Sequence, residues 1–143
     1  MIIPVKKTND LAIIPARQTK GAAGFDFHSV EDLVIMPGET AIVGTGLAFE
    51  LPTNLELQVR PRSGMSAKTK IRVGNSPGTI DSDYRGEIKI ILDNIGTLPY
   101  TVKVGDRIAQ GVLNEINQYP LYEVEEFASE TARGTSGFGS TGV

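Results

Sequence analysis

Two carboxylates lie close together in an acidic stretch, residues 78–87, which reads GTIDSDYRGE. Its spacing suggests a calcium loop starting at Asp81, but such a loop needs an oxygen ligand at its fifth position and a glutamate at its twelfth, where Arg85 and Leu92 stand. Calcium is therefore excluded. Two interpretations stay open: a hairpin whose aspartates stabilise its turn, or a carboxylate on a rigid β element that orients and deprotonates a water molecule.

A candidate anion site lies upstream, where Arg60-Pro61-Arg62 leads into residues 63–68, the one segment expected to be helical. Ser63 is expected to be the N-cap of this short helix. A helix start beside the planar Arg62 cation favours an anion such as phosphate. An ordinary surface turn between strands is the alternative.

Residues 133–143, RGTSGFGSTGV, contain four glycines and four Ser or Thr residues, a composition typical of a flexible linker. Two phosphate-loop spacings fit this tail, but both motifs need a following helix and the sequence ends first. Glycine N–H groups with Ser, Thr and Arg donors can still approach an anion. The linker interpretation therefore stands unless motifs elsewhere in the chain indicate a ligand that this tail could bind.

Composition narrows the class of protein. The 143 residues suit a single domain, and 14 Lys and Arg against 17 Asp and Glu, without a basic block, argue against a nucleic-acid polymer as partner. No cysteine and a single histidine, His28, exclude disulfides, thiolate sites and imidazole clusters, so any metal must be a hard cation on oxygen ligands. No signal segment and no apolar run of about 18 residues are present, so we expect a soluble, cytoplasmic protein without membrane contact.

Short strands separated by turn formers must position these groups. Residues 55–60, 88–90 and 100–104 alternate between apolar and polar side chains, which predicts half-buried strands, whereas residues 33–36 and 41–43 are expected to be more fully buried. No sustained helical stripe occurs. The pattern predicts an all-β sandwich or jelly roll.

Five segments, in order, resemble the five signature motifs of the trimeric dUTP pyrophosphatase (dUTPase) family. Phe25, Phe27 and Met65 are apolar substitutes within these motifs, and Ser66 adds a hydroxyl whose effect stays open. No departure touches a residue expected to carry chemistry. The segments are residues 23–29 (AGFDFHS), 61–68 (PRSGMSAK), 78–86 (GTIDSDYRG), 105–110 (GDRIAQ) and 133–142 (RGTSGFGSTG).

The resemblance implies a distorted all-β jelly roll with one short helix and a flexible C-terminal arm. Residues 1–132 would form a single domain that includes the arm, and residues 133–143 a lid of the same domain. It also implies a homotrimer whose active sites lie at subunit interfaces, with the tail of one subunit crossing to a neighbour.

The activity implied is hydrolysis of dUTP to dUMP and pyrophosphate, by attack of water on the α-phosphorus, with Mg²⁺ as cofactor. Asp81 would activate the water, Arg133 would act as an arginine finger, and Asp26 would hold the metal through its water shell. Arg107, on the strand face opposite Ile108, Gln110 and Val112, is expected to support a neighbouring carboxylate.

The substrate would be bound by residues from four of the motifs and from the turn before the third. Asn75 would distinguish uracil from cytosine. Tyr84 would pack on the deoxyribose, be a core residue of the hairpin, or do both. Phe138 would stack on uracil. The full set expected to contact dUTP is Arg62, Ser63, Gly64, Asn75, Gly78, Thr79, Tyr84, Gln110, Phe138, Gly139, Ser140 and Thr141.

Two other functions stay open. The first is a bifunctional dCTP deaminase that also hydrolyses dUTP, a group that tends to be longer and lacks the Asp81–Tyr84 hairpin in this form. The second is a non-catalytic regulator that keeps the nucleotide site as a sensor. A purely structural jelly-roll protein would show neither binding nor turnover.

Overall fold

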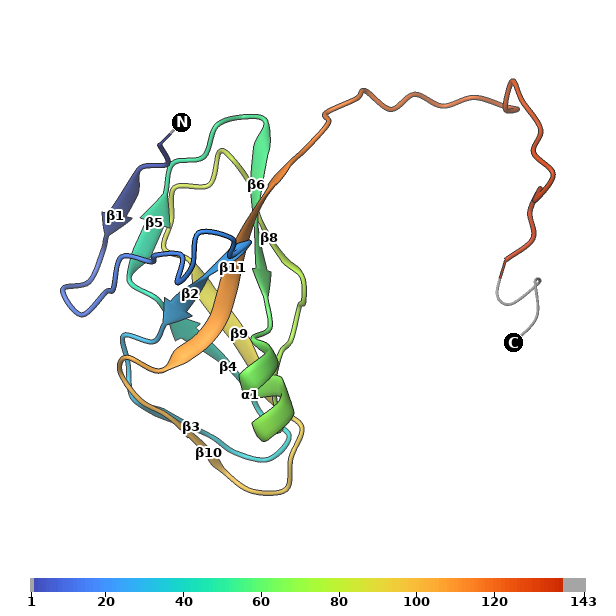
Figure 1. Cartoon of the computed structure of the whole chain (residues 1–143). Coiled ribbons are helices and arrows are strands. Elements are labelled where there is room, and N and C mark those ends of the chain that lie inside the picture. Colours follow the sequence, from blue (N-terminus) through green and yellow to red (C-terminus); the bar gives the residue numbers. More distant parts are fainter. Residues whose placement is uncertain (1, 138–143) are drawn as a thin grey trace.

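The computed structural model describes residues 2–137, which fold into antiparallel sheets with one short helix (Figure 1). The all-β prediction is therefore confirmed. The elements are β1 (Val5–Lys7), β2 (Gly24–His28), β3 (Leu33–Ile35), β4 (Thr40–Gly44), β5 (Leu47–Phe49), β6 (Leu55–Arg60), α1 (Ser63–Lys68), β7 (Ile71–Val73), β8 (Gly78–Ile80), β9 (Lys89–Asn94), β10 (Tyr100–Val102) and β11 (Arg107–Glu115).

The largest sheet has the strand order β2-β11-β6-β8, with every neighbouring pair antiparallel. Because side chains alternate along a strand, Phe25 and Phe27 of β2 are buried, while Asp26 between them lies on the other face. This alternation places a charged residue outside the core without interrupting the strand.

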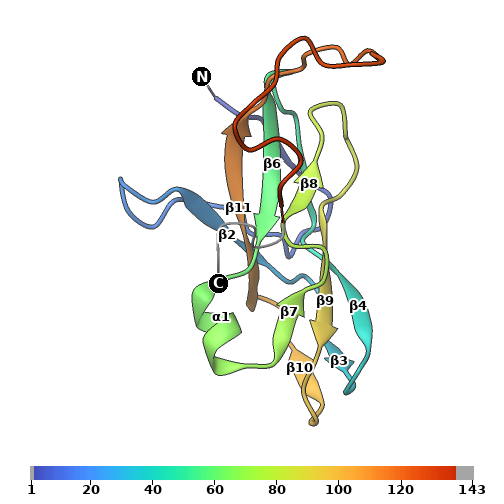
Figure 2. The same ribbon diagram turned by 90° about the vertical axis from the view of Figure 1, so that its right-hand side faces the viewer.

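A second sheet, β4-β9-β7, faces the first across the core, and the ribbons β1-β5 and β3-β10 complete the fold (Figure 2). Leu57 and Val59 of β6 belong to the same buried cluster as Ile90 and Leu92 of β9. The apolar core therefore lies between the two sheets, as expected for a jelly roll.

The prediction that residues 33–36 and 41–43 are more fully buried than the alternating strands is wrong. Val34 of β3 is 53% exposed and Ile42 of β4 is 63% exposed, while Ile35 and Val43 are buried. Each strand packs only one of its faces on the core, so an apolar run here does not indicate burial on both faces.

The helix also differs by one residue from its prediction. Its N-cap is Arg62, which has an extended backbone and makes no side-chain capping hydrogen bond, and Ser63 is the first helical residue. The chain leaves β6 in an extended conformation and begins to turn only after Arg62.

Within residues 2–137, no helix is long and apolar enough to cross a membrane.

After β11 the chain continues as an arm that runs away from the sheets (Figure 1). The amide of Ile116 donates to the carbonyl of Asn54 at 2.9 Å, and residues 117–136 are exposed throughout. The large apolar side chains of this arm lie outside the core and are exposed: Tyr119, Leu121, Tyr122, Val124 and Phe127.

Candidate active site

A carboxylate held between two arginines lies at one edge of the four-stranded sheet. Asp26 Oδ1 accepts a hydrogen bond from Arg62 Nε at 2.6 Å, and Asp26 Oδ2 accepts one from Arg107 Nη1 at 3.4 Å. Strand β2 supplies Asp26, the N-cap of α1 supplies Arg62, and the start of β11 supplies Arg107. The expectation that Arg107 supports a neighbouring carboxylate is confirmed, and that carboxylate is Asp26.

His28 lies two residues along β2 from this carboxylate. Its Nδ1 atom is buried and has no hydrogen-bond partner within residues 2–137. Burial lowers the pKa of the His28 imidazole below its ordinary value; the Asp26 charge opposes this shift, while Arg107 and Arg62 add to it. The ring is therefore neutral at pH 7.

Gln110 lies beside Asp26 in the register of the sheet and donates from Nε2 to the carbonyl of Pro61 at 2.8 Å. A Cβ atom at Gly24 would lie 2.8 Å from Gln110 Oε1 and 3.4 Å from Val112 Cγ2, so these two side chains share one face. Ile108 does not follow this alternation, because the register shifts between Arg107 and Ala109, and both Ile108 and Ala109 are buried. The prediction that Ile108 shares the face of Gln110 is wrong.

Ser63 and Gly64 are exposed at the first turn of α1, and no heavy atom lies within 4 Å of an ideal Cβ at Gly64. A polar hollow of about 380 Å³ opens beside them, with Arg62, Lys68 and Arg107 among its lining residues. Three cations against the one carboxylate of Asp106, which also lines the hollow, suit a polyanion such as a triphosphate.

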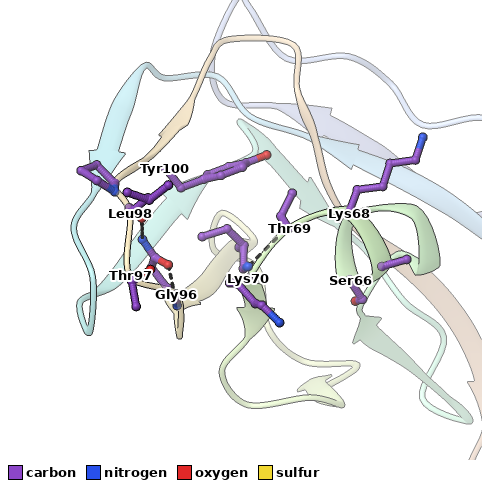
Figure 3. A pocket seen from close by; sticks show the side chains of 12 residues that line it. Ser66, Lys68, Thr69, Lys70, Gly96, Thr97, Leu98 and Tyr100 are labelled. Carbon is purple, nitrogen blue, oxygen red and sulfur yellow. Dashed lines mark hydrogen bonds between the residues drawn. The ribbon is translucent and has the colours of Figure 1, made fainter.

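A second hollow, of about 420 Å³ and also lined by Tyr100, lies between the end of α1 and the loop after β9 (Figure 3). Asn94 shapes this loop: it donates to the carbonyl of Leu98 at 2.8 Å and accepts from the amide of Gly96 at 3.0 Å. Burial raises the pKa of Tyr100, as does the nearby charge of Asp106. Within residues 2–137, none of the predicted site residues lines this hollow.

The predicted catalytic hairpin joins β7, β8 and the exposed turn that follows. Asp81 is exposed, and its carbonyl accepts from the amide of Tyr84 at 3.2 Å. The Tyr84 hydroxyl donates to the carbonyl of Glu87 at 3.0 Å, and the ring lies against the backbone of Gly86. Tyr84 is 46% exposed, so the interpretation of Tyr84 as a core residue is wrong.

The other predicted residues of this hairpin are Asn75, Gly78 and Thr79. Asn75 is exposed, and a Cβ atom at the buried Gly78 would lie 3.1 Å from Asn75 Nδ2. Thr79, Asp81 and Tyr84 line a hollow of about 290 Å³ together with apolar side chains of β4 and β9.

One chain does not bring these two groups of residues together. Asp26 lies on β2 at one edge of the four-stranded sheet, and Asp81 follows β8 at the other edge. Three strand spacings of about 4.8 Å place these edges about 14 Å apart. Within residues 2–137, no hydrogen bond or ion pair joins Asp26, Arg62 or Gln110 to residues 74–84.

The tail is described only as far as residue 137. Arg133 is exposed and donates from Nε to the carbonyl of Ser136 at 2.9 Å. The predicted substrate residues Phe138, Gly139, Ser140 and Thr141 lie outside the described residues.

No group of three or more His, Asp or Glu side chains that could hold a metal occurs in the described part of the chain. Asp26 already accepts from two arginines, but a carboxylate offers about four acceptor positions, so it can also accept from the water shell of a hydrated ion. The site therefore fits Mg²⁺ that arrives on a polyphosphate and keeps its waters, and it does not fit an ion held by protein ligands alone.

A family model described as dUTPase matches residues 10–142. The chain belongs to the dUTPase family. Over 142 residues it is 55% identical to the deoxyuridine 5'-triphosphate nucleotidohydrolase of Nautilia profundicola, covering 99% of each chain. It is 51% identical to the enzyme of the same name from Helicobacter hepaticus, covering 100% of this chain and 90% of that relative.

Solved structures of dUTPases have the same fold as this family member. The dUTPase of Staphylococcus bacteriophage 80alpha, solved with dUpNHpp, superposes with a TM-score of 0.95 at 31% identity over 99% of each chain. A mutant dUTPase of phage phi11, described with a structural Mg(II) ion, superposes with a TM-score of 0.85 at 28% identity, covering 90% of this chain and 100% of the other.

Sequence reasoning missed one contact in this dUTPase-family site. It assigned Arg62 to phosphate and Asp26 to the metal, but did not anticipate that the two side chains bind each other. They are 36 residues apart, and only the pairing of β2 and β6 with β11 brings them together. Knowledge that these three strands pair antiparallel would have placed the side chains of Asp26 and Arg62 next to each other.

Proposed function

We propose that this chain hydrolyses dUTP to dUMP and pyrophosphate by attack of water on the α-phosphorus. The observation that carries the proposal is the match to the dUTPase family over residues 10–142, together with relatives at 55% and 51% identity that are named deoxyuridine 5'-triphosphate nucleotidohydrolase. The cationic hollow beside Asp26 supports it independently, because it suits a triphosphate.

Asp81 is proposed as the general base. Its exposed carboxylate stands on a turn closed by its own carbonyl and the Tyr84 amide, so it can take a proton from water while the turn keeps its position. Tyr84, fixed by its hydrogen bond to Glu87, would pack on the deoxyribose, and Asn75 with Gly78 and Thr79 would bind uracil. A base that pairs wrongly with this hairpin would leave buried polar groups unsatisfied.

The phosphates are proposed to bind Arg62, Ser63, Gly64 and Gln110, which lie around the exposed start of α1. Arg133 would approach the same charge from the tail as an arginine finger, which stabilises the charge that spreads over the phosphate oxygens during the reaction. Residues 133–143 would serve as the lid, with Phe138 on uracil and Gly139, Ser140 and Thr141 around the γ-phosphate.

Mg²⁺ is proposed as the cofactor, and when bound it would neutralise phosphate charge and polarise the phosphorus–oxygen bonds. Asp26 would face its water shell. The two arginines hold the Asp26 carboxylate in position at the phosphate corner.

A homotrimer with shared active sites is proposed because Asp26 and Asp81 lie on opposite edges of one sheet. A neighbouring subunit that presents its hairpin to the Asp26 corner would supply the missing half of the site. The exposed apolar side chains of the arm are consistent with packing on another subunit.

The decisive experiment measures pyrophosphate release from dUTP, dCTP, dTTP and UTP, with Mg²⁺ and with a chelator. We expect fast release from dUTP only, and only with Mg²⁺. Formation of dUTP or dUMP from dCTP would instead indicate the bifunctional deaminase, and tight dUTP binding without turnover would indicate the sensor. Absence of both binding and turnover would contradict the proposal.

A further inference from the structure

The ion pair between Asp26 and Arg62 joins two residues that are assigned to different parts of the bound substrate. Arg62 is proposed to bind phosphate and Asp26 to face the Mg²⁺ water shell. In this structure each is the other's partner, with Arg62 Nε 2.6 Å from Asp26 Oδ1 and Arg62 Nη2 3.5 Å from Asp26 Oδ2. The same N–H groups cannot bind Asp26 and grip a phosphate at the same time.

The Nε and Nη2 edge of a guanidinium is the fork that matches two oxygens of a carboxylate or a phosphate. In Arg62 this edge is occupied by Asp26. A triphosphate carries several negative charges against the single charge of Asp26, so it competes strongly for the fork. Release of Arg62 would leave Asp26, only 13% exposed, with one fewer cation.

Arg107 is the cation that would remain beside Asp26 after Arg62 has moved away. Its Nη1 atom lies 3.4 Å from Asp26 Oδ2, on the oxygen where Arg62 has its longer contact. The backbone of Arg107 is paired with His28 at the start of β11, so the guanidinium is carried by the same sheet as Asp26. A partly buried carboxylate without a cationic partner is strongly disfavoured, and Arg107 prevents that state.

We propose that triphosphate binding transfers Arg62 from Asp26 to the phosphates, and that Arg107 then alone holds and orients the Asp26 carboxylate. Arg107 is thus a positioning residue for the side of the site that faces Mg²⁺. The exchange couples the two ligands: phosphate that takes Arg62 frees further acceptor positions on Asp26 for the Mg²⁺ water shell. This inference rests on the proposed function of the same site.

The test is calorimetric titration of dUpNHpp into the wild-type protein and into Arg107→Gln, Arg107→Lys and Arg17→Gln, each with Mg²⁺ and with a chelator. The measured quantity is the factor by which Mg²⁺ tightens analogue binding. Arg17 is exposed in the loop before β2 and controls for the loss of one charge. Thermal melting of each variant checks that it is folded.

We expect Arg107→Gln to lose about 10- to 100-fold of the tightening by Mg²⁺, the range seen when a residue that orients a metal-facing side chain is removed. Its affinity for dUpNHpp in chelator should change little, Arg107→Lys should keep part of the effect, and Arg17→Gln should match the wild type. If Arg107→Gln does not fold, Arg107→Lys decides, since its ammonium lacks the guanidinium geometry.

Two results would overturn the inference. Full tightening by Mg²⁺ in both Arg107 variants would show that Asp26 does not depend on Arg107. An equal loss of affinity with and without Mg²⁺ in Arg107→Gln would show that Arg107 binds the phosphates directly. A wild-type protein that does not bind dUpNHpp at all would contradict the proposed function itself, which distinguishes the two failures.

Discussion

His28 is the only histidine of the chain, so its imidazole can be followed without interference from other rings. Its pKa is lowered from 6.5, mainly by burial. The folded state therefore binds fewer protons than the unfolded state around and below pH 6.5, which is the ordinary value of the imidazole. The stability that this group contributes is present above that pH and is lost as the pH falls toward the lower folded value.

This predicts an NMR titration midpoint for the His28 ring below 6.5. The free energy of unfolding, measured in urea between pH 8 and pH 5, should fall less steeply in His28→Gln than in the wild type. A midpoint at or above the ordinary value would contradict this account of the ring.

At the residue scale, sequence reasoning anticipated the support of a carboxylate by Arg107 but placed Arg107 on the wrong face. The register shift between Arg107 and Ala109 puts Arg107 on the face of Asp26 and Gln110. Sequence reasoning did not anticipate the bond between Arg62 and Asp26, nor the buried Nδ1 of His28. Both depend on which strands are neighbours, and a single strand pattern carries no such information.

At the scale of elements, strand β11 contains a glycine that two aromatic rings require. A Cβ atom at Gly111 would lie 2.6 Å from Phe25 Cε2 and 2.9 Å from Phe27 Cε2. The two rings pack edge to face with centroids 5.6 Å apart, and Phe25 also stacks on Phe49 at 6.0 Å. A methyl group here would have to displace a packed cluster between β2 and β11.

Gly111→Ala should therefore lower the free energy of unfolding by about 1–3 kcal/mol, as other overpacked cores do. Urea denaturation of the two proteins measures this difference. Gly21→Ala is the matched control, since no heavy atom lies within 4 Å of its ideal Cβ, and it should stay within about 0.5 kcal/mol of the wild type. Equal stability of both variants would mean that the rings adjust freely.

Element prediction from the sequence was best where apolar and polar residues alternate. Residues 55–60 form β6 with the predicted bounds. It failed for residues 33–36 and 41–43, because an apolar side chain on the outer face of a strand has the same sequence signature as one in the core. Ile42 is an example: it faces away from the core of its own chain.

At the scale of the whole molecule, the division of the site between two sheet edges leads to a prediction about mixed subunits. Asp81→Asn alone should lose about 10²- to 10⁴-fold in turnover, as expected for a lost general base, and Arg62→Ala should also be nearly inactive. When the two variants are unfolded together and reassembled in equal amounts, an Arg62 from one subunit can meet an Asp81 from another.

Random assembly places both variants together in about three quarters of the trimers. In each such mixed trimer, one of the three sites has both an intact Arg62 and an intact Asp81. About one quarter of the wild-type rate per subunit should therefore return. The pyrophosphate assay measures this recovery, and refolded single variants are the control. No recovery on mixing would indicate that each chain supplies Arg62 and Asp81 to the same site.

The exposed arm also bears on how a purified sample ages. In the single chain, residues 117–136 are accessible along their whole length and contain no strand or helix. Proteases should therefore cut there first whenever the arm is not packed on another subunit. A cut there leaves every strand of residues 5–115 in place and removes the tail that is proposed to close over the nucleotide. A stored preparation should therefore lose turnover while its melting temperature stays the same, so intact mass rather than folding is the measure of its quality.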